Sequence, residues 1–265
     1  MEFTRKANIH YLDPELLKSA AVSVQGFTTR HEGVSRAPYN SLNLGLNTFD
    51  SPHSVQGNRS LLARSFGAKA EKFVMVNQCH GSDILVIDEP NPDYAHFQKI
   101  DCDGIITNQP RVMIAVGVAD CVPLLLLDPV KRVAAALHAG WKGSAANIAA
   151  KGVESLVKLF GSDRSRILAA IGPAIGPCCY EVDKTVCDAF SASGVEWAEV
   201  SSEAGAGKWQ LDLARVNLLQ LLDAGLESGN IESAGKCVSC DHDRFFSYRR
   251  DGGETGRQAG FIMLN

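Results

Sequence analysis

The sequence lacks the features that mark several common classes of protein. Its net charge is −4, and its 26 lysines and arginines form no basic run, which argues against a nucleic-acid partner. The N-terminal segment has no apolar stretch of the kind found in secretory signal peptides. The longest apolar run, residues 113–128, is interrupted by Asp120 and Pro123 and is too short to cross a bilayer. These absences favour a cytoplasmic protein with no membrane partner.

Cysteine is present, with eight residues, but without the pattern of a disulfide-rich secreted domain. Cys237 and Cys240 form a CxxC pair, whereas Cys178 and Cys179 are adjacent and do not supply a second spaced pair. A Cys/Cys/His metal site that includes His242 is one interpretation of the pair. We favour packed, unreactive thiols.

Strand and helix patterns are interspersed without strict alternation, which predicts an α+β fold with mixed sheets. Apolar runs predict a hairpin over 72–81 and 83–89, a buried strand over 112–128 paired with 132–141, and a strand, turn and strand over 243–265. Residues 90–99 are expected to be a loop. Helical spacing predicts helices over 54–66, 144–160, 183–192 and 210–226. We expect residues 1–265 to form one catalytic domain.

Three chemically reactive residues follow or interrupt apolar runs. They are His80 in NQCHGSD, Cys121 in VADCVPLLLLD and His138 in ALHAGWKG. Neighbouring strands that each supply one side chain are typical of a catalytic zinc site, in which three protein ligands leave one position open. Zinc in such a site lowers the pKa of a bound water to about 7.

The same three residues fit two other interpretations. Cys121 and His138 would make a metal-free nucleophile and base, which leaves His80 without a role. Alternatively, all three would be buried side chains with purely structural roles. The wide spacing in the sequence does not distinguish these possibilities.

Charged residues near these motifs are candidates for substrate binding. Arg59, Arg249, Arg250 and Lys142 could bind phosphate, since a guanidinium matches the geometry of phosphate oxygens. The acidic candidates are Asp101, Asp103, Asp120 and Glu181. Asp120, beside Cys121, could orient a histidine or move a proton, and Glu181 is the other candidate for proton transfer. Each of these residues could instead lie on a solvated surface or cap a turn.

Taken together, the motifs resemble the YfiH-type family, also called the laccase-domain, polyphenol-oxidase or DUF152 family. The matching stretches cover nearly the whole chain: YNSLNLG, Asn58-Arg59, NQCHGSD, DGIIT, VADCVPLLL, HAGWKG, IGPAIGPCCYEV and FFSYRRDGGETGRQA. Lys142 stands where some members have arginine, which preserves the positive charge. The resemblance implies a four-layer α/β/β/α arrangement with mixed sheets.

The resemblance also implies a function. It implies a zinc ion bound by His80, Cys121 and His138, and purine nucleosides and phosphate as substrates, with Asn43 of YNSLNLG among the binding residues. The implied reactions are phosphorolysis of adenosine, inosine and 5′-methylthioadenosine, and deamination of adenosine. It leaves the oligomeric state open.

Two other activities are associated with proteins that resemble this chain. One is a Cys–His hydrolase or amidase that edits peptidoglycan precursors. The other is copper-dependent phenol oxidation, which fits the residues poorly because multicopper oxidases need many histidines and this chain has seven. Copper would still bind a Cys/His/His site in vitro, since it outcompetes zinc at most nitrogen and sulfur sites.

Overall fold

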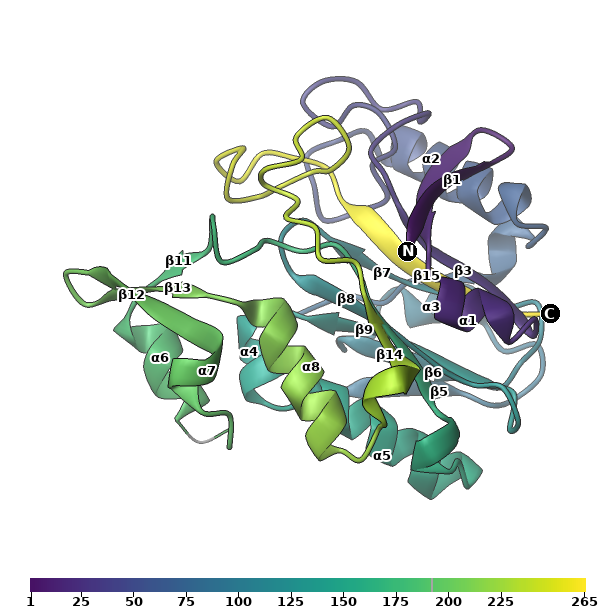
Figure 1. Cartoon of the computed structure of the whole chain (residues 1–265). Helices are drawn as coiled ribbons and strands as arrows, with labels where there is room; N and C mark the ends of the chain where they lie inside the picture. Colours follow the sequence, from purple (N-terminus) through teal and green to yellow (C-terminus); the bar gives the residue numbers. More distant parts are fainter. Residues whose placement is uncertain (192) are drawn as a thin grey trace.

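The computed structural model describes residues 1–191 and 193–265, in which the strands form two six-stranded sheets and one three-stranded sheet (Figure 1). Across the first sheet the order is β1 (Glu2–Lys6), β2 (Ile9–Asp13), β3 (Ser23–Thr28), β15 (Gln258–Leu264), β7 (Met113–Val118) and β4 (Phe73–Val74). Across the second it is β14 (Ile231–Ser233), β10 (Leu168–Ile171), β8 (Val122–Asp128), β9 (Val133–Ala139), β6 (Gly104–Thr107) and β5 (Ile84–Ile87). The small sheet has the order β11 (Glu181–Val182), β13 (Lys208–Leu211) and β12 (Ser201–Gly205).

Helices connect these strands and cover the outer faces of the large sheets. The α-helices are α1 (Glu15–Ser19), α2 (Pro52–Ser65), α3 (Tyr94–Phe97), α4 (Trp141–Ala145), α5 (Ile148–Phe160), α6 (Lys184–Phe190), α7 (Trp197–Val200) and α8 (Leu213–Asp223). Short 3₁₀ turns occur at η1 (Ala70–Lys72), η2 (Arg164–Arg166) and η3 (Ser228–Asn230). None of the described helices combines the length and the apolar composition that a bilayer span requires.

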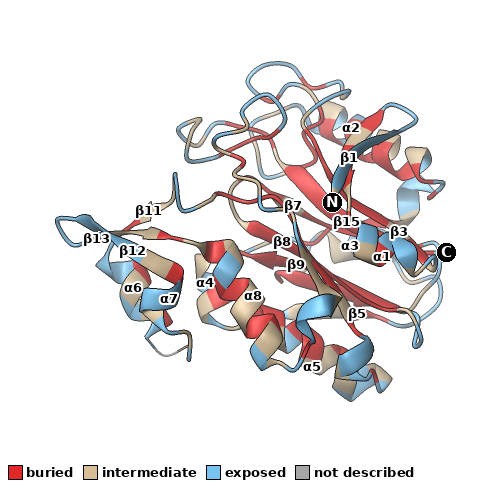
Figure 2. Cartoon of the chain, in the orientation of Figure 1, coloured by how far each residue is buried: buried red, intermediate tan, exposed pale blue. Residues whose placement is uncertain are grey.

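The two large sheets pack face to face, and the burial of β8 shows how the layers are arranged. Leu125 and Leu127 belong to the cluster between the sheets, whereas Leu124 and Leu126 face α5 and α8 on the other side. This alternation follows from the two-residue period of a strand. On the opposite side of the molecule, α2 packs Leu62 against the first sheet. The layers therefore run helix, sheet, sheet, helix, with the most buried strands at the centre (Figure 2), and the predicted four-layer α+β fold is confirmed.

Several predicted elements are confirmed. The helix predicted over 54–66 is α2, and the second half of the strand predicted over 112–128 pairs with the strand predicted over 132–141, as β8 and β9, which are antiparallel. The predictions over 183–192 and 210–226 correspond to α6 and α8, although residue 192 lies outside the described residues. The helix predicted over 144–160 ends at Gly161 as expected, but Asn147 has a left-handed conformation (φ 63°) that divides it into α4 and α5.

Three strand predictions are wrong in an informative way. The hairpin over 72–81 and 83–89 does not exist, because β4 pairs with β7 in the first sheet and β5 pairs with β6 in the second. The run 112–128 is two strands, β7 and β8, which lie in different sheets. Within 243–265 β15 is formed, whereas the first half is irregular. Residues 94–97 also form the short helix α3 where a loop was expected.

The chain passes between the two large sheets after β4, after β6, between β7 and β8, and after β14. Two of these crossings carry candidate site residues: the first follows β4, and the second lies between β7 and β8. Asp120, at the second crossing, has φ 94°, and His80, at the first, has φ 62°. Positive φ is uncommon for residues other than glycine, although Asp and His tolerate it better than most. These two crossings bring polar side chains to the shared edge of both sheets.

Candidate metal centre and its cavity

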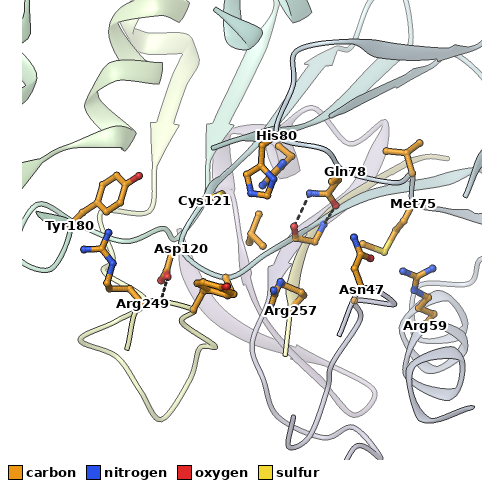
Figure 3. Close-up of a pocket in the computed structure, with 17 residues that line it drawn as sticks. Asn47, Arg59, Met75, Gln78, His80, Asp120, Cys121, Tyr180, Arg249 and Arg257 are labelled. Atoms are coloured by element: carbon orange, nitrogen blue, oxygen red, sulfur yellow. Dashed lines mark hydrogen bonds between the residues drawn. The ribbon is translucent and has the colours of Figure 1, made fainter. Parts of the chain in front are cut away.

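His80, Cys121 and His138 meet at this edge. Figure 3 shows His80 and Cys121 side by side in the wall of a cavity. His80 follows β4, Cys121 immediately precedes β8, and His138 lies in β9 opposite Pro123. One donor atom from each of the three side chains lies within 4.8 Å of the others. The two imidazole rings are 4.8 Å apart between centroids and are nearly perpendicular, at 77°. The structure thus brings together residues that are far apart in the sequence.

Gly140 leaves the space in which these side chains approach one another. A Cβ atom at this position would lie 3.0 Å from Cδ2 of His80 and 3.1 Å from Sγ of Cys121. Its backbone is in an ordinary extended conformation, with φ −73° and ψ 171°. The glycine is therefore required for its small size and not for an unusual backbone angle.

Asp103 anchors both histidines. Its buried carboxylate accepts a hydrogen bond from Nδ1 of His138 at 2.7 Å and from the backbone N–H of His80 at 2.9 Å. Burial raises the pKa of Asp103, but the hydrogen bonds from His138 and other donors outweigh it and bring the pKa to about 2. The carboxylate is thus ionised at neutral pH, and it leaves Nε2 of His138 free to face the other two donors.

Cys121 and His138 form a strongly polarised pair. Burial raises the pKa of the Cys121 thiol, but the two histidines lower it by a larger amount, and the resulting pKa is about 6. Burial lowers the pKa of His138, whereas Cys121 and Asp103 raise it to about 9. Without a metal, the pair is favoured as a Cys121 thiolate beside a His138 imidazolium. A metal cation that displaces the His138 proton would leave Cys121 as a thiolate.

The donor set fits a divalent metal ion such as zinc. Two imidazoles and a thiolate are ligands that zinc prefers, and a carboxylate behind one ligating histidine is a common supporting feature of such sites. Three donors leave one coordination position open, as in catalytic zinc sites.

The three donors lie in the wall of a cavity of about 600 Å³. This volume is within the range of about 300–1,000 Å³ that is usual for small-molecule sites. Its lining includes three arginines, two tyrosines and several polar groups: Arg59, Arg249, Arg257, Tyr180, Tyr248, Asn47, Gln78 and Asp120. Gln78 is fixed by a pair of hydrogen bonds of 2.8 Å with the backbone of Gly117 (Figure 3).

Arg59 projects from α2 into this cavity and is 6% exposed. Its Nε donates to the carbonyl of Leu44 at 2.8 Å, and no carboxylate in the described part of the chain lies within ion-pair distance of it. Burial lowers the pKa of Arg59 to about 10, so the guanidinium remains charged at neutral pH. A buried cation without a counter-ion in a cavity wall is a favourable place for an anion.

Arg257 and Arg249 are the other cations in the wall. Arg257 donates to the carbonyls of Thr255 and Gly256 and lies 5.6 Å from the Tyr248 ring. Arg249 donates through its side chain to the carbonyl of Glu181 at 2.9 Å and lies 5.2 Å from the Tyr180 ring. The cavity thus combines positive charge with aromatic surface.

Asp120 also lines the cavity, but its contacts differ from those of Asp103. Its carboxylate accepts hydrogen bonds of 2.6 Å from Oγ of Ser247 and from the backbone N–H of Arg249. Burial raises the pKa of Asp120, and these donors only partly offset it. The residue that orients His138 is therefore Asp103, and Asp120 instead holds the loop that carries Arg249.

Four of the predicted site residues lie outside the cavity lining. Asn43 is buried and holds backbone N–H groups of Gly45 and Arg257. Lys142 is exposed, and its ammonium lies 5.5 Å from the Trp141 ring.

The other two hold neighbouring segments together. The carboxylate of Glu181 pairs with Lys208 at 2.6 Å. Arg250 pairs with Asp251 and donates to the carbonyls of Val238 and Phe245.

Sequence reasoning missed Arg257 and Gln78, and it assigned the orientation of a histidine to Asp120 although Asp103 was also an acidic candidate. Asp103 stands directly before a buried strand in DCDGIIT, and this position at a strand end was the signal that favours it over Asp120. Arg257 and Gln78 lie within matched motifs, but only the fold shows that they face the cavity.

Comparison with known proteins identifies relatives over almost the full length of the chain. The family described as multi-copper polyphenol oxidoreductase laccase matches residues 24–265. The chain belongs to this laccase-domain family. A purine nucleoside phosphorylase of Deinococcus radiodurans is 41% identical over 251 residues, which cover 94% of this chain and 92% of that protein. Purine nucleoside phosphorylase YlmD of Bacillus subtilis is 37% identical over 245 residues, covering 91% and 88%.

Solved structures of laccase-domain proteins share the fold. The YfiH protein of Bacillus licheniformis superposes with a TM-score of 0.91 at 35% identity, covering 99% of each chain. YlmD of Geobacillus stearothermophilus superposes with a TM-score of 0.90 at 35% identity, covering 99% of this chain and 98% of that chain. The expected resemblance to the YfiH-type family is confirmed.

Proposed function

We propose that this chain is a zinc-dependent purine nucleoside phosphorylase. Its substrates would be phosphate and adenosine, inosine or 5′-methylthioadenosine, and deamination of adenosine would be a second reaction. The observation that carries this proposal is that one cavity combines a three-donor metal set with Arg59, a buried cation without a counter-ion. The similarity to purine nucleoside phosphorylases of Bacillus subtilis and Deinococcus radiodurans supports the same proposal.

His80, Cys121 and His138 would hold the zinc ion. When bound, zinc supplies a Lewis acid that lowers the pKa of water or of a hydroxyl group at its open position. Asp103 keeps His138 in the tautomer that offers Nε2, and Gly140 keeps the space between the donors clear. These two residues position the site without contacting substrate.

Arg59 and Arg257 would bind phosphate, because both guanidinium groups reach the cavity and a phosphate dianion would neutralise their charge. In phosphorolysis a phosphate oxygen forms a bond to C1′ of the ribose while the bond from C1′ to the purine nitrogen breaks. The bonding electron pair leaves with the purine, and the proton of hydrogen phosphate ends on the purine nitrogen. Two cations near the attacking oxygen position it and screen its charge from the substrate.

Tyr180 and Tyr248 would provide the aromatic surface for the purine, since stacking of a base on an aromatic ring contributes about 1–3 kcal/mol. Asp120 is our candidate for proton transfer to the departing purine. Among the described residues that line the cavity, Asp120 is the one with a carboxyl group. Burial raises the pKa of Asp120, which favours proton exchange nearer to neutral pH. Glu181, paired with Lys208 away from the lining, is the weaker candidate.

Deamination would use the same pocket with water in place of phosphate. A water oxygen forms a bond to C6 of adenine, the bond from C6 to the amino nitrogen breaks, and ammonia leaves after gaining a proton. Arg59 has no role in this reaction, because no phosphate takes part. Loss of Arg59 should therefore impair phosphorolysis more than deamination.

The test is to incubate the purified protein with adenosine, with and without phosphate, and to measure adenine, ribose 1-phosphate and inosine. Phosphate-dependent formation of adenine and ribose 1-phosphate that stops on chelation and returns with zinc is the expected result. If a protein with a full complement of zinc produces neither adenine nor inosine, the proposal is wrong. A His138→Asn variant controls for a contaminating enzyme.

A second candidate function rests on the polarised Cys121–His138 pair. A thiolate, an imidazolium and the Asp103 carboxylate are also the parts of a Cys–His hydrolase or amidase, with peptidoglycan precursors as candidate substrates. A thiolate attack on an amide would not need a metal. Hydrolase activity that survives chelation and is lost in Cys121→Ser would favour this function over phosphorolysis.

Copper-dependent phenol oxidation is a weaker alternative. The same donors would accept copper in place of zinc. However, two imidazoles and one thiolate bind a single ion, whereas multicopper chemistry needs several. Oxidase activity proportional to added copper, and absent from the zinc-loaded protein, would mark it as adventitious.

A further inference from the structure

A second group of metal-binding side chains lies outside the cavity lining. Cys178 and Cys179 come from the loop after β10, and Cys237 and Cys240 come from the loop after β14. One sulfur from each lies within 4.8 Å of the other three. The sulfurs of Cys178 and Cys179 are each 3.5 Å from that of Cys240. The adjacent pair and the CxxC pair, separated by more than fifty residues in the sequence, therefore form one cluster.

The spacing of these sulfurs matches a common central ion. A tetrahedral zinc with bonds of about 2.3 Å to sulfur places its four sulfurs about 3.8 Å from one another. A disulfide would require two sulfurs about 2.05 Å apart. The sulfur–sulfur distances in the cluster, 3.5 Å for two pairs and at most 4.8 Å for the others, lie on both sides of the value for zinc. They are much longer than a disulfide bond.

Backbone hydrogen bonds hold the two loops in register. The N–H of Val238 donates to the carbonyl of Ala174 at 3.0 Å, and the N–H of Ala174 donates to the carbonyl of Lys236 at 3.2 Å. The N–H of Gly176 donates to Sγ of Cys237 at 3.2 Å. Backbone N–H groups of Cys240 and Ser239 also face this sulfur. The cluster is thus built on a fixed backbone with donors aimed at a sulfur.

We propose that Cys178, Cys179, Cys237 and Cys240 bind a second zinc ion with a structural role. Four thiolates fill all four positions of a tetrahedral zinc, so this ion would have no open position for substrate. His242, considered from the sequence as a ligand, pairs with Asp243 at 3.2 Å instead.

The place of the cluster indicates what this zinc would stabilise. The loop after β10 continues to Tyr180, which lines the cavity, and Ile175 in that loop donates to the carbonyl of Asp120 at 2.9 Å. On the other side, Arg250 donates to the carbonyl of Val238 at 2.9 Å. The zinc would therefore tie together the two loops that support one wall of the cavity.

The first test is thiol labelling of the native wild-type protein with iodoacetamide, followed by mass spectrometry of the peptides. Cys178 and Cys240 are exposed, so they would react readily if they were free. We expect all four cluster cysteines to resist labelling until a chelator removes the metal, while Cys187 on α6 reacts in both states. Labelling of Cys178 and Cys240 at the rate of Cys187 in untreated protein, or a disulfide within the cluster, would overturn the proposal.

The second test is the zinc content of protein purified without nickel. We expect two zinc ions per wild-type chain, and one in each of the paired variants Cys178→Ser/Cys240→Ser and His80→Ala/His138→Ala. Cys187→Ser is the matched control and should retain two. One zinc ion per wild-type chain, or two in the Cys178→Ser/Cys240→Ser protein, contradicts the proposal. Because this site lies outside the nucleoside cavity, its loss and a failure of phosphorolysis are separate results.

Discussion

Gly140→Ala is the most direct test of how closely the three donors converge. The added methyl group would lie 3.0 Å from the His80 ring and 3.1 Å from the Cys121 sulfur, closer than ordinary van der Waals contact. Since alanine adopts the backbone angles of Gly140 without strain, the effect comes from crowding of the donors. The neighbouring atoms must move by a few tenths of an ångström, whereas metal–ligand distances tolerate deviations of only about 0.2 Å.

The expected magnitude follows from the cost of overpacking, which is typically about 1–3 kcal/mol. If the zinc-bound state bears that cost, zinc affinity falls by about 5- to 150-fold, since about 1.4 kcal/mol corresponds to a factor of ten. The assay is competition for zinc against a chelator of known affinity, with circular dichroism to verify folding. Gly229→Ala is the matched control, because its methyl group would meet no atom within 4 Å.

Wild-type zinc affinity in a folded Gly140→Ala protein would refute this reasoning. It would mean either that the donors do not converge on one ion or that they have room to spare. Reduced affinity in Gly229→Ala would show instead that the assay responds to general destabilisation.

Three further predictions concern individual residues. Asp103→Asn should lower zinc affinity about 10- to 100-fold, because the amide cannot replace all the hydrogen bonds that hold the two histidines. Unchanged zinc affinity in the chelator assay would contradict this prediction. Arg59→Gln should raise the KM for phosphate by about 10- to 150-fold, which corresponds to the loss of a charged hydrogen bond of about 1.5–3 kcal/mol. The KM for adenosine should change little, and Arg59→Lys should be less impaired than Arg59→Gln. Equal effects on the KM of both substrates would argue against phosphate binding by Arg59. In zinc-free protein, alkylation of Cys121 should reach half its maximal rate near pH 6, since the pKa is lowered to about 6 and the reactive thiolate forms above it. Cys102, whose pKa burial raises to about 11, should stay unreactive at that pH, and a midpoint for Cys121 above pH 8 would contradict the electrostatic account.

The parts of the fold that depend on local pattern could be predicted from the sequence. Helix α2 has helical spacing and ends before Gly67, which has φ 76° and suits the end of a helix. Strands β8 and β9 are continuous apolar runs separated by a turn, as expected for strands buried on both faces.

The crossings between sheets could not be predicted, because no local signal marks them. Residues 113–128 are apolar on both sides of Asp120, so the change of sheet looks like the interior of one strand. After β4 the backbone is held by hydrogen bonds from His80 and Gly81 to Asp103, which is more than twenty residues away in the sequence. A long-range contact replaces the hairpin that the apolar pattern predicts.

The candidate site was predictable in its donors but not in its surroundings. His80, Cys121 and His138 stand out because polar residues end or interrupt apolar runs. Which carboxylate faces His138, and which arginines reach the cavity, depends on the path of loops far apart in the chain. The Cys178–Cys179 and Cys237–Cys240 pairs show the same limit, since neither has the spacing of a complete site and only the fold brings them together.

The account rests on one ion being held jointly by His80, Cys121 and His138, and anomalous X-ray diffraction at the zinc absorption edge measures this directly. Crystals of active protein, purified without added metal, should show an anomalous peak about 2.0–2.3 Å from the three donor atoms. No peak there, in crystals of protein that converts adenosine and phosphate to adenine, would contradict the account.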